Sequence, residues 1–496
     1  MVLSYLKQVT RGSVFGSLLI LVPFDCYASV TNDDPVHQNE SITEYSDTDD
    51  ADGILGNWSG HLQTPAGPLA FVLEIEQKDR RFLARAQSPS QSPEYFPVDT
   101  VELVNGKFTF AIDNLNIRFE GGLSRDKKTI SGDFAQGPAV MKLKLDREPI
   151  EKKLSVRPQT PIPPFDYLAE EVKVLNSKAN ITLAGTLTRP IGRIKATAVM
   201  ITGSGPQDRD ETILRHRPFA VIADHLAKNG FAVLRLDDRG VGQSTGNFET
   251  ATSEDFAGDT NSAIQYLKAR NDIPPDTIGL IGHSEGGMIA PMVAARRDDL
   301  AFAILLAGPG VDIVDLYIEQ RSNIFLSMGV KPEKISEIKQ LDAIVFEQIN
   351  RLSDDSEISE ETLALMRKVS RLVGVQERNA IELQVEALAK TYTTPWFRYF
   401  LKFDPEPYIR EIKVPVLAIN GSLDAQVTAK QNLAGIQNSL AEVNHNDYRV
   451  VELEGLNHLL QTAETGAISE YNQIEETIAP QVLNLISGWL DERFGE

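Results

Sequence analysis

Short apolar runs separated by turn residues characterise residues 53–148. Two of these runs are Phe71–Ile75 and Phe108–Ile112, and the turn signals between runs include Gly121 and Gly122. Apolar runs at this hairpin spacing are typical of antiparallel strands. We therefore expect residues 53–148 to form a small antiparallel β domain, either a barrel or a sandwich.

A proline-rich linker follows at residues 149–166, and beyond it the pattern of apolar positions changes. Across residues 167–496, short apolar runs alternate with segments of helical periodicity, which is typical of a mostly parallel sheet covered by helices on both faces. The runs predict strands at Ile181–Leu187, Ala196–Ile201, Ala232–Leu236, Thr277–Ile281, Ala301–Leu306, Val414–Ile419 and Tyr448–Leu453. The helical segments predict helices at Phe219–Asn229, Asp255–Arg270, Gly287–Ala295, Ala429–Leu440 and Pro480–Leu490.

The alternation stops between about residues 310 and 410, where the chain is helical and charged, as in Glu333–Gln348 and Glu360–Val373. A helical insertion between two sheet strands predicts a lid over a site at the edge of the sheet. Aromatic residues gather near the end of this insertion: Trp396, Phe397, Tyr399, Phe400 and Phe403. They either line an apolar pocket or pack the insertion onto the sheet, and the sequence leaves both interpretations open.

Residues 1–28 have the order of a secretory signal peptide. Lys7 and Arg11 precede the uncharged stretch Gly12–Phe24, and small residues follow up to Ala28. This order predicts cleavage after Ala28 and export to the periplasm or the medium. A permanent membrane anchor is the weaker hypothesis, because a spanning helix needs about 20 apolar residues.

Composition indicates an acidic globular protein. The 496-residue chain is 42% hydrophobic and 24% charged, and its formal net charge is −21. This negative charge argues against nucleic acid and anionic membranes as partners. The single cysteine, Cys26, lies inside the predicted signal peptide, so we expect no disulfide after export. Residues 29–52 are polar and acidic, which predicts a disordered spacer.

The segment Gly282-His283-Ser284-Glu285-Gly286 has the pattern Gly-x-Ser-x-Gly directly after a predicted strand and before a predicted helix. In a nucleophile elbow the serine occupies a strained turn, and the two glycines let strand and helix approach closely. This placement makes Ser284 the candidate nucleophile.

A serine hydroxyl needs a histidine to accept its proton, and an elbow-type hydrolase places that histidine after the serine. Only His445 and His458 follow Ser284. His458 comes just past the predicted strand Tyr448–Leu453, where this fold displays its catalytic groups. We therefore predict His458 as the base, and we interpret His445, which precedes that strand in a polar run, as a solvated loop residue.

The histidine in turn needs a carboxylate that holds its productive tautomer. Asp424 follows the predicted strand that ends at Ile419, and in this fold the acid lies between serine and histidine in the chain. Asp424 is therefore the predicted acid. Asp404 and Glu406 are alternatives, although they fall before that strand.

Acyl transfer also needs N–H donors directed at the developing oxyanion. One donor is predicted to be the backbone N–H of Glu285, the residue after the nucleophile. The second should come from the turn Thr202–Pro206 after the predicted strand Ala196–Ile201. Glycines in this turn let amides face inward, so we favour Ser204, with Gly205 as the alternative.

Three motifs together resemble the bacterial EstD-like esterases, a branch of the α/β-hydrolases. They are Gly203–Glu211, Asp237–Ser244 and the elbow segment 282–287, and the resemblance extends from about residue 167 to the C-terminus. It implies an α/β-hydrolase fold preceded by the small β domain, carboxylic esters as substrates, and a triad of Ser284, Asp424 and His458.

Four charged residues near these motifs are interpreted as ion pairs that fix loops beside the oxyanion hole: Asp208, Arg209, Asp238 and Arg239. The loop after Arg239 lacks the lysine of a phosphate-binding loop, and no histidine and carboxylate cluster has the spacing of metal ligands. We therefore expect neither a cofactor nor a metal.

These observations predict an exported serine hydrolase that cleaves small-molecule carboxylic esters through an acyl-enzyme on Ser284. A peptidase or a thioesterase would use the same triad, so both remain alternatives. A binding protein with a vestigial hydrolase fold is the alternative from a different class. We expect no nucleic-acid partner and no membrane span after signal cleavage, and the oligomeric state is left open.

Overall fold

The computed structural model describes residues 51–64, 67–78, 81–89, 95–104, 106–115, 117–136, 139–147, 157–353, 356–375 and 378–495. The predicted signal peptide lies outside the described residues, as does the predicted spacer except for its last two residues. The same holds for residues 149–156 of the predicted linker.

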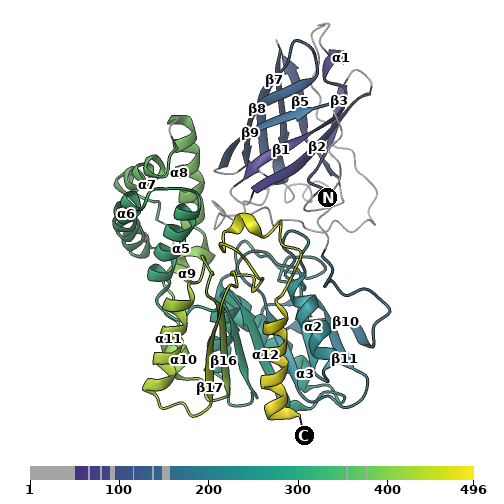
Figure 1. The fold of residues 1–496 in the computed structure, drawn as a ribbon, viewed down its shortest axis with the longest axis vertical. Helices are drawn as coiled ribbons and strands as arrows, with labels where there is room; N and C mark the ends of the chain where they lie inside the picture. The colour runs from purple at the N-terminus through teal and green to yellow at the C-terminus, as the bar shows by residue number, and fades with distance from the viewer. Residues whose placement is uncertain are drawn as a thin grey trace, which may run out of the picture. The chain divides into compact units, whose positions relative to one another are not determined.

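The chain divides into two compact units. The first, called here the β unit, contains the N-terminal strands together with Val375–Tyr392. The second, called the α/β unit, contains Ser155–Gly374 and Thr393–Glu496. Figure 1 shows the strands of the β unit in purple to blue and the α/β unit from teal to yellow.

The β unit is built on one antiparallel sheet whose strands lie in the order β4-β3-β2-β1-β9-β8-β7-β6-β5. After the short helix α1 (Ala51–Ile54), its strands are β1 (Gly56–Thr64), β2 (Gly67–Lys78), β3 (Arg81–Gln87), β4 (Phe96–Pro97), β5 (Thr100–Val104), β6 (Lys107–Ile112), β7 (Ile117–Leu123), β8 (Thr129–Gln136) and β9 (Ala139–Asp146). The predicted antiparallel β domain is confirmed. A two-sheet sandwich is wrong, because β1 pairs with β9 and so joins strands β1–β4 and β5–β9 into a single curved sheet (Figure 1).

Alternating burial explains why these sequences form strands. In β7, Ile117 and Phe119 are buried while Arg118 and Glu120 are exposed, as expected when successive side chains point to opposite faces. On the buried face, the ring of Phe110 stacks on Phe119 with 5.0 Å between centroids. The β unit therefore has an aromatic core of its own.

The α/β unit is built on an eight-stranded sheet in the order β10-β11-β13-β12-β14-β15-β16-β17. Its strands are β10 (Tyr167–Asn176), β11 (Ile181–Pro190), β12 (Thr197–Ile201), β13 (Ala232–Leu236), β14 (Ile278–His283), β15 (Ala303–Leu306), β16 (Val416–Gly421) and β17 (Tyr448–Leu453). β11 pairs antiparallel with β10 and β13, and the remaining neighbours are parallel. The carboxyl ends of the parallel strands therefore meet at one edge of the sheet.

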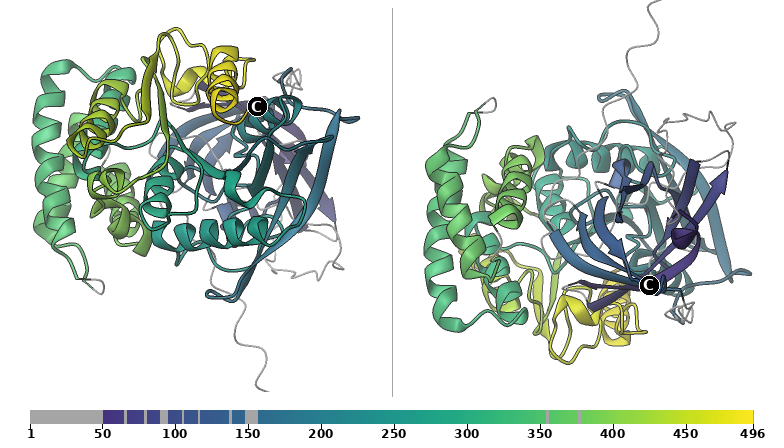
Figure 2. Two further views of the ribbon diagram at one scale, coloured as in Figure 1. Left: turned by 90° about the horizontal axis from the view of Figure 1, so that it is seen from below. Right: turned by 90° about the horizontal axis from the view of Figure 1, so that it is seen from above.

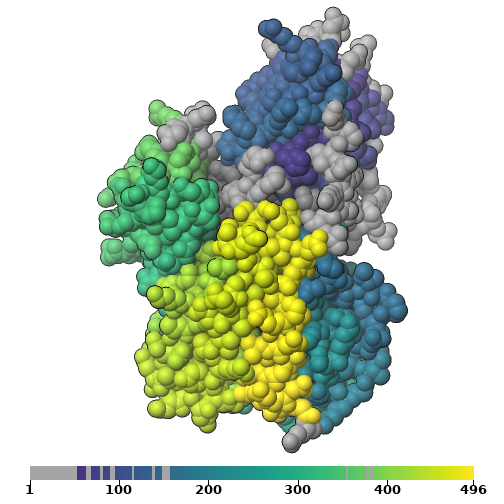
Figure 3. Space-filling model, in the orientation of Figure 1, coloured from purple at the N-terminus to yellow at the C-terminus, as the bar shows by residue number. Residues whose placement is uncertain are grey.

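Helices cover both faces of this sheet (Figures 1 and 2). One apolar core lies beneath α2 (Pro218–Lys228) and α12 (Pro480–Phe494). The other lies beneath α3 (Ser253–Lys268), α4 (Glu285–Ala294) and α11 (Ala429–Glu442). The predicted parallel sheet between two helical layers is thus confirmed, and Figure 3 shows the C-terminal residues in yellow at the surface of this unit.

All seven predicted strands of this unit are present, with ends shifted by a few residues, but β10 was not predicted. β10 is an edge strand in which Glu170, Glu171 and Lys173 interrupt the apolar positions. This segment is a strand because it pairs with β11, and its own amino-acid composition does not reveal that pairing.

The chain between β15 and β16 is helical, as predicted. It contains α5 (Ile313–Ser327), α6 (Pro332–Asn350), α7 (Glu360–Leu372), α8 (Arg378–Tyr392), α9 (Pro395–Leu401) and α10 (Glu406–Arg410). The segment with α8 belongs to the β unit, whereas the other five helices belong to the α/β unit. A lid function for the insertion remains a prediction. No helix of the described residues is long and apolar enough to cross a membrane.

Candidate active site

Ser284 lies at a sharp turn between β14 and α4. Its φ of 55° and ψ of −119° are unfavourable for a residue with a Cβ atom, so the turn holds it under strain. Glycine is required at positions 282 and 286, because a Cβ atom at either position would clash with the neighbouring backbone. A Cβ at Gly282 would lie 2.0 Å from the carbonyl oxygen of Gly286, and one at Gly286 would lie 2.1 Å from that of Ile201. This is the geometry of a nucleophile elbow.

The loops after β14, β16 and β17 bring the three predicted catalytic residues together. His458 Nε2 lies 3.1 Å from Ser284 Oγ, and His458 Nδ1 lies 2.8 Å from Asp424 Oδ2. His458 and Asp424 are buried, whereas Ser284 is half-buried. A hydrogen-bond chain of this kind can carry the serine proton to the histidine.

Backbone N–H groups fix the carboxylate of Asp424. Its Oδ1 accepts hydrogen bonds from the N–H groups of Gln426 and Val427, both at 2.8 Å, which leaves Oδ2 for His458. The carboxylate therefore has one defined orientation toward the imidazole ring.

The alternative residues lie elsewhere. Asp404 accepts the N–H of Glu406, and Glu406 pairs with Arg410 in α10. The Nδ1 of His445 accepts the N–H of Asp447 in the loop before β17. None of these contacts involves Ser284, so the structure groups Asp424 and His458, rather than the alternatives, with the serine.

The two predicted oxyanion donors lie in segments next to Ser284: Glu285 follows it in the chain, and Ser204 follows Gly203, where a Cβ would lie 3.2 Å from the Cβ of Ser284. Glu285 is the first residue of α4, and the first N–H groups of a helix have no acceptor within it. Ser204 lies in the loop between β12 and α2, residues 202–217, called here the oxyanion loop after its predicted role. The preceding N–H, of Gly203, already donates to Glu211 Oε1 at 2.6 Å. The assignment of Ser204 and Glu285 as donors remains a prediction.

The Glu285 side chain joins the elbow to two other elements. Its carboxylate accepts the Ser253 hydroxyl at 2.6 Å and the Trp396 indole N–H at 3.0 Å. Burial raises the pKa of Glu285, and the hydrogen bonds from Ser253, Trp396 and Ser204 lower it in part. The contact with Ser204 connects the two residues predicted to supply the oxyanion donors.

Most of the aromatic group of the insertion packs onto the sheet, which is one of the two interpretations left open by the sequence. Phe400 and Phe403 are buried in the apolar core beneath α3 and α4, so they pack the insertion onto the sheet. Trp396 packs against the same core and also donates its indole N–H to Glu285 beside the nucleophile.

Two further residues of the site were not predicted. Glu211, at the end of the oxyanion loop motif, receives hydrogen bonds from Gly203 and from His283, the residue before the nucleophile. The other ring nitrogen of His283 lies 3.0 Å from the backbone oxygen of His458. The available signals were the position of His283 inside the elbow motif and the position of Glu211 at the end of the motif Gly203–Glu211.

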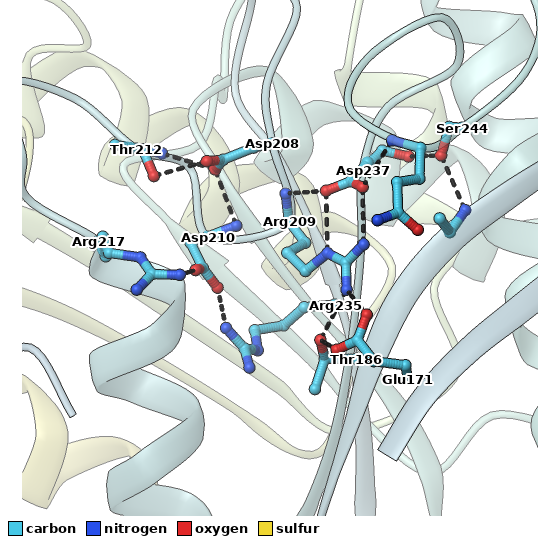
Figure 4. A network of polar contacts seen from close by, with 12 residues as sticks. Glu171, Thr186, Asp208, Arg209, Asp210, Thr212, Arg217, Arg235, Asp237 and Ser244 are labelled. Atoms are coloured by element: carbon cyan, nitrogen blue, oxygen red, sulfur yellow. Dashed lines mark hydrogen bonds and ion pairs between the residues drawn. The ribbon is translucent and has the colours of Figure 1, made fainter. Parts of the chain in front are cut away.

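A second polar cluster, called here the arginine network, connects the oxyanion loop to the antiparallel edge of the sheet (Figure 4). Its members are Glu171, Thr186, Arg209, Asp210, Arg217, Arg235 and Asp237. The Arg209 guanidinium bonds Asp237 through Nε at 3.0 Å and Nη2 at 2.8 Å, and its Nη1 bonds Thr186 and Glu171. Asp210 is buried and pairs with both Arg217 and Arg235.

The ion-pair interpretation is confirmed for both arginines of the four charged residues. Arg209 pairs with Asp237, and Arg239 pairs with Asp259 at 2.8 Å. It is wrong for Asp208 and Asp238, which accept hydrogen bonds from their own and neighbouring loops. Burial raises the pKa of Asp238 well above its usual range. Among the described residues, no group of three His, Cys, Asp or Glu side chains could hold a metal ion.

A protein-family model matches about half of the chain. Residues 216–465 match the model of the family described as Serine aminopeptidase, S33. The chain belongs to this family. The matched range includes β14, β16 and β17 together with the loops after them that carry Ser284, Asp424 and His458, which supports the predicted α/β-hydrolase fold.

Among relatives, the chain is 25% identical to esterase EstD of Thermotoga maritima over 309 residues, which is 62% of this chain and 65% of EstD. The match therefore spans slightly less than two thirds of EstD. The chain is also 27% identical to the uncharacterized peptidase YtmA of Bacillus subtilis over 204 residues, which is 40% of this chain and 73% of YtmA. The solved esterase Pf2001 of Pyrococcus furiosus is 14% identical, with a TM-score of 0.40 over 68% of this chain and 98% of that chain. The predicted similarity to EstD-like esterases is confirmed.

Proposed function

We propose that this chain hydrolyses carboxylic esters through an acyl-enzyme on Ser284. The observation that supports this most directly is the hydrogen-bond chain from Ser284 Oγ through His458 to Asp424, at 3.1 and 2.8 Å. Similarity to EstD, an esterase, supports the choice of esters as the substrate class.

In the first half of the reaction, Ser284 Oγ attacks the ester carbonyl carbon while its proton passes to His458 Nε2. The negative oxygen of the tetrahedral intermediate accepts hydrogen bonds from the N–H groups of Ser204 and Glu285. Asp424 remains ionised and stabilises the imidazolium. The intermediate collapses when the bond to the alkoxy oxygen breaks and His458 protonates the leaving alcohol.

In the second half, His458 accepts a proton from water, and the hydroxide attacks the acyl carbon. Collapse of the second intermediate returns the proton to Ser284 Oγ and releases the carboxylic acid. The same groups thus serve both halves, so no group beyond the chain and water is needed.

Replacement of Ser284 by alanine tests the proposal. Ser284→Ala should lower kcat for a short p-nitrophenyl ester by about 10⁶-fold, the effect of removing the nucleophile in a comparable serine hydrolase. The variant should keep its thermal unfolding transition and lose labelling by a fluorophosphonate probe. Undiminished turnover would contradict the role of Ser284, and a wild-type protein that the probe does not label would favour a non-catalytic binding protein.

A peptidase or thioesterase activity is the second candidate, because the family is described as a serine aminopeptidase family and YtmA is named a peptidase. Amides and thioesters differ from esters in the leaving group, while the triad remains the same. Values of kcat/KM for an ester, a thioester and an aminoacyl amide with one acyl group separate the three. A preference for the amide would overturn the esterase proposal.

We also propose that the protein acts after export, since residues 1–28 have the order of a cleaved signal. Expression of the full chain and sequencing of the mature N-terminus provide the test. A mature protein beginning at Ser29 is expected, and retention of residues 1–28 in the cytoplasm would contradict export.

A further inference from the structure

His283 connects the elbow to two loops on either side of it. The side chain is buried, its Nδ1 lies 3.0 Å from Glu211 Oε1, and its Nε2 lies 3.0 Å from the carbonyl oxygen of His458. Each ring nitrogen therefore faces an oxygen that can accept a hydrogen bond.

The two partners determine where protons must lie. A backbone carbonyl cannot donate, so Nε2 must carry a proton, and a neutral imidazole has no second proton for Nδ1. A second proton therefore lies between Nδ1 and Glu211 Oε1. Because this Oε1 also accepts the N–H of Gly203 at 2.6 Å, the ionised carboxylate is favoured and the proton belongs to the imidazole.

Charged and titratable groups reach His283 from three loops. They are Glu211 on the oxyanion loop, Asp424 after β16 and His458 after β17, whose ring centroid lies 5.0 Å from that of His283. Burial lowers the pKa of His283, but the charge and hydrogen bond of Glu211, helped by the His458 carbonyl and Asp424, raise it above its usual value.

We propose that Glu211 and His283 are positioning residues that form a buried carboxylate–imidazolium pair, and that loss of the shared proton at high pH lowers turnover. This inference rests on the proposed function. One end of the pair holds the backbone of His458, the proposed base. The other end holds Gly203, directly before Ser204, the proposed oxyanion donor.

The pair would act through geometry, since neither side chain contacts Ser284 Oγ in the hydrogen bonds described above. When the imidazolium loses its proton, Nδ1 and the Glu211 carboxylate face each other with lone pairs, so one of the two hydrogen bonds of His283 must break. The oxyanion loop and the His458 loop are then no longer fixed relative to each other, and small displacements of catalytic groups reduce the rate strongly.

The pH profile of kcat distinguishes this role from a purely structural one. Glu211→Gln keeps an oxygen that can accept the Gly203 N–H but removes the charge, so the alkaline limb should move to lower pH by about one to three units. His283→Gln keeps a donor but cannot titrate, so kcat should fall by about 10- to 100-fold and the alkaline limb should disappear. His225→Gln is the matched control, because His225 is half-buried on α2 and bonds Ser487 away from the site.

The charge state of His283 can be measured without turnover. In the full-length protein labelled with [¹⁵N]histidine, both ring nitrogens of His283 should be protonated at neutral pH, and the signal is assigned by its absence in His283→Gln. The pair is overturned if His283 carries one ring proton at neutral pH, or if the pH profile of Glu211→Gln matches that of the wild type. If the wild type does not hydrolyse esters, the proposed function fails, and the NMR titration still decides whether the charged pair exists.

Discussion

Two clusters of polar side chains lie near the carboxyl ends of the parallel strands of the α/β unit. The first, the catalytic cluster, contains Ser284, His458, Asp424, His283 and Glu211, and the second is the arginine network, which shares the oxyanion loop with it. Two consecutive residues of that loop belong to different clusters, because Asp210 pairs with Arg235 while Glu211 bonds His283. The loop thus contributes one carboxylate to each cluster.

The two clusters differ in how their polar groups are satisfied. In the arginine network the carboxylates of Asp210 and Asp237 are neutralised by guanidinium groups. In the catalytic cluster Ser284 is strained and half-buried, and the N–H of Glu285 at the start of α4 has no acceptor within the helix. A dense set of ion pairs therefore does not by itself indicate an active site. A reactive group that remains accessible and strained is the more informative feature.

The largest predicted effect falls on the catalytic cluster. Asp424→Asn should lower kcat by about 10⁴-fold, because an asparagine at this position allows the wrong tautomer of His458. The backbone hydrogen bonds from Gln426 and Val427 can persist, so the unfolding midpoint should change little. Steady-state kinetics and urea unfolding measure the two quantities, and a variant with near wild-type kcat would remove Asp424 from the mechanism.

The arginine network should show the opposite behaviour. Asp210→Asn leaves the guanidinium of Arg235, whose side chain is 10% exposed, without its carboxylate. Removing one partner of a buried ion pair typically costs about 3–5 kcal/mol of unfolding free energy. We expect a lower urea midpoint, with a loss of kcat far smaller than in Asp424→Asn. If Asp210→Asn reduced kcat as strongly as Asp424→Asn while leaving stability intact, the distinction between the clusters would be wrong.

Much of the fold could be predicted because local patterns determine it. The seven predicted strands of the α/β unit have apolar runs, and the elbow has a fixed spacing of glycines around Ser284. The edge strand β10 and the single sheet of the β unit were missed because they depend on which strands pair. Pairing between β1 and β9 joins residues about 80 positions apart, and no local signal reports it.

The residues of the candidate site also fall into those that the sequence predicts and those that it does not. Ser284, Asp424 and His458 could be predicted to lie together, since each follows a parallel strand and such strand ends meet at one edge. The contact of Glu211 with His283 could not be predicted, because Glu211 itself has a φ of 52°, a loop conformation that the sequence pattern does not report. The contact between Trp396 and Glu285 depends on the path of the helical insertion, which the apolar pattern does not determine.

A smaller predicted effect concerns the pH dependence of stability at a second buried histidine, His216. Its partners favour the neutral ring, in contrast to those of His283. His216 has Thr477 Oγ1 at 2.9 Å from Nδ1 and the carbonyl of Tyr471 at 3.0 Å from Nε2. The side-chain amide nitrogen of Gln461 also lies 3.1 Å from Nε2. Because both the hydroxyl and this amide can donate, none of these partners requires a second ring proton. Burial, with the charge of Arg157, lowers the pKa of His216 to about 4.

The stability supplied by neutral His216 should therefore be complete above the unfolded pKa of about 6.5 and decline as the pH falls toward 4. The shift corresponds to about 3 kcal/mol of unfolding free energy. Urea unfolding at several pH values, compared between the wild type and His216→Asn, isolates this contribution. The difference in unfolding free energy should shrink between pH 7 and 4, and a constant difference would mean that His216 does not titrate in this range. For His283, the pH dependence of the unfolding free energy has the opposite sign, because its stabilising charge is lost as the pH rises through its raised pKa.

The smallest predicted effect lies at the boundary between the catalytic cluster and the helical insertion. Trp396→Phe removes the indole N–H that donates to Glu285 but keeps an aromatic ring against Phe400, on which Trp396 stacks at 5.1 Å. The lost hydrogen bond to a charged group is worth about 1.5–3 kcal/mol at most, and Ser253 and Ser204 still bond the carboxylate. We therefore expect a fall in kcat of a few-fold with KM nearly unchanged for a short ester. A rise in KM with kcat unchanged would instead place Trp396 against the bound substrate, and the aromatic end of the insertion would then belong to the acyl pocket rather than to the support of the oxyanion donors.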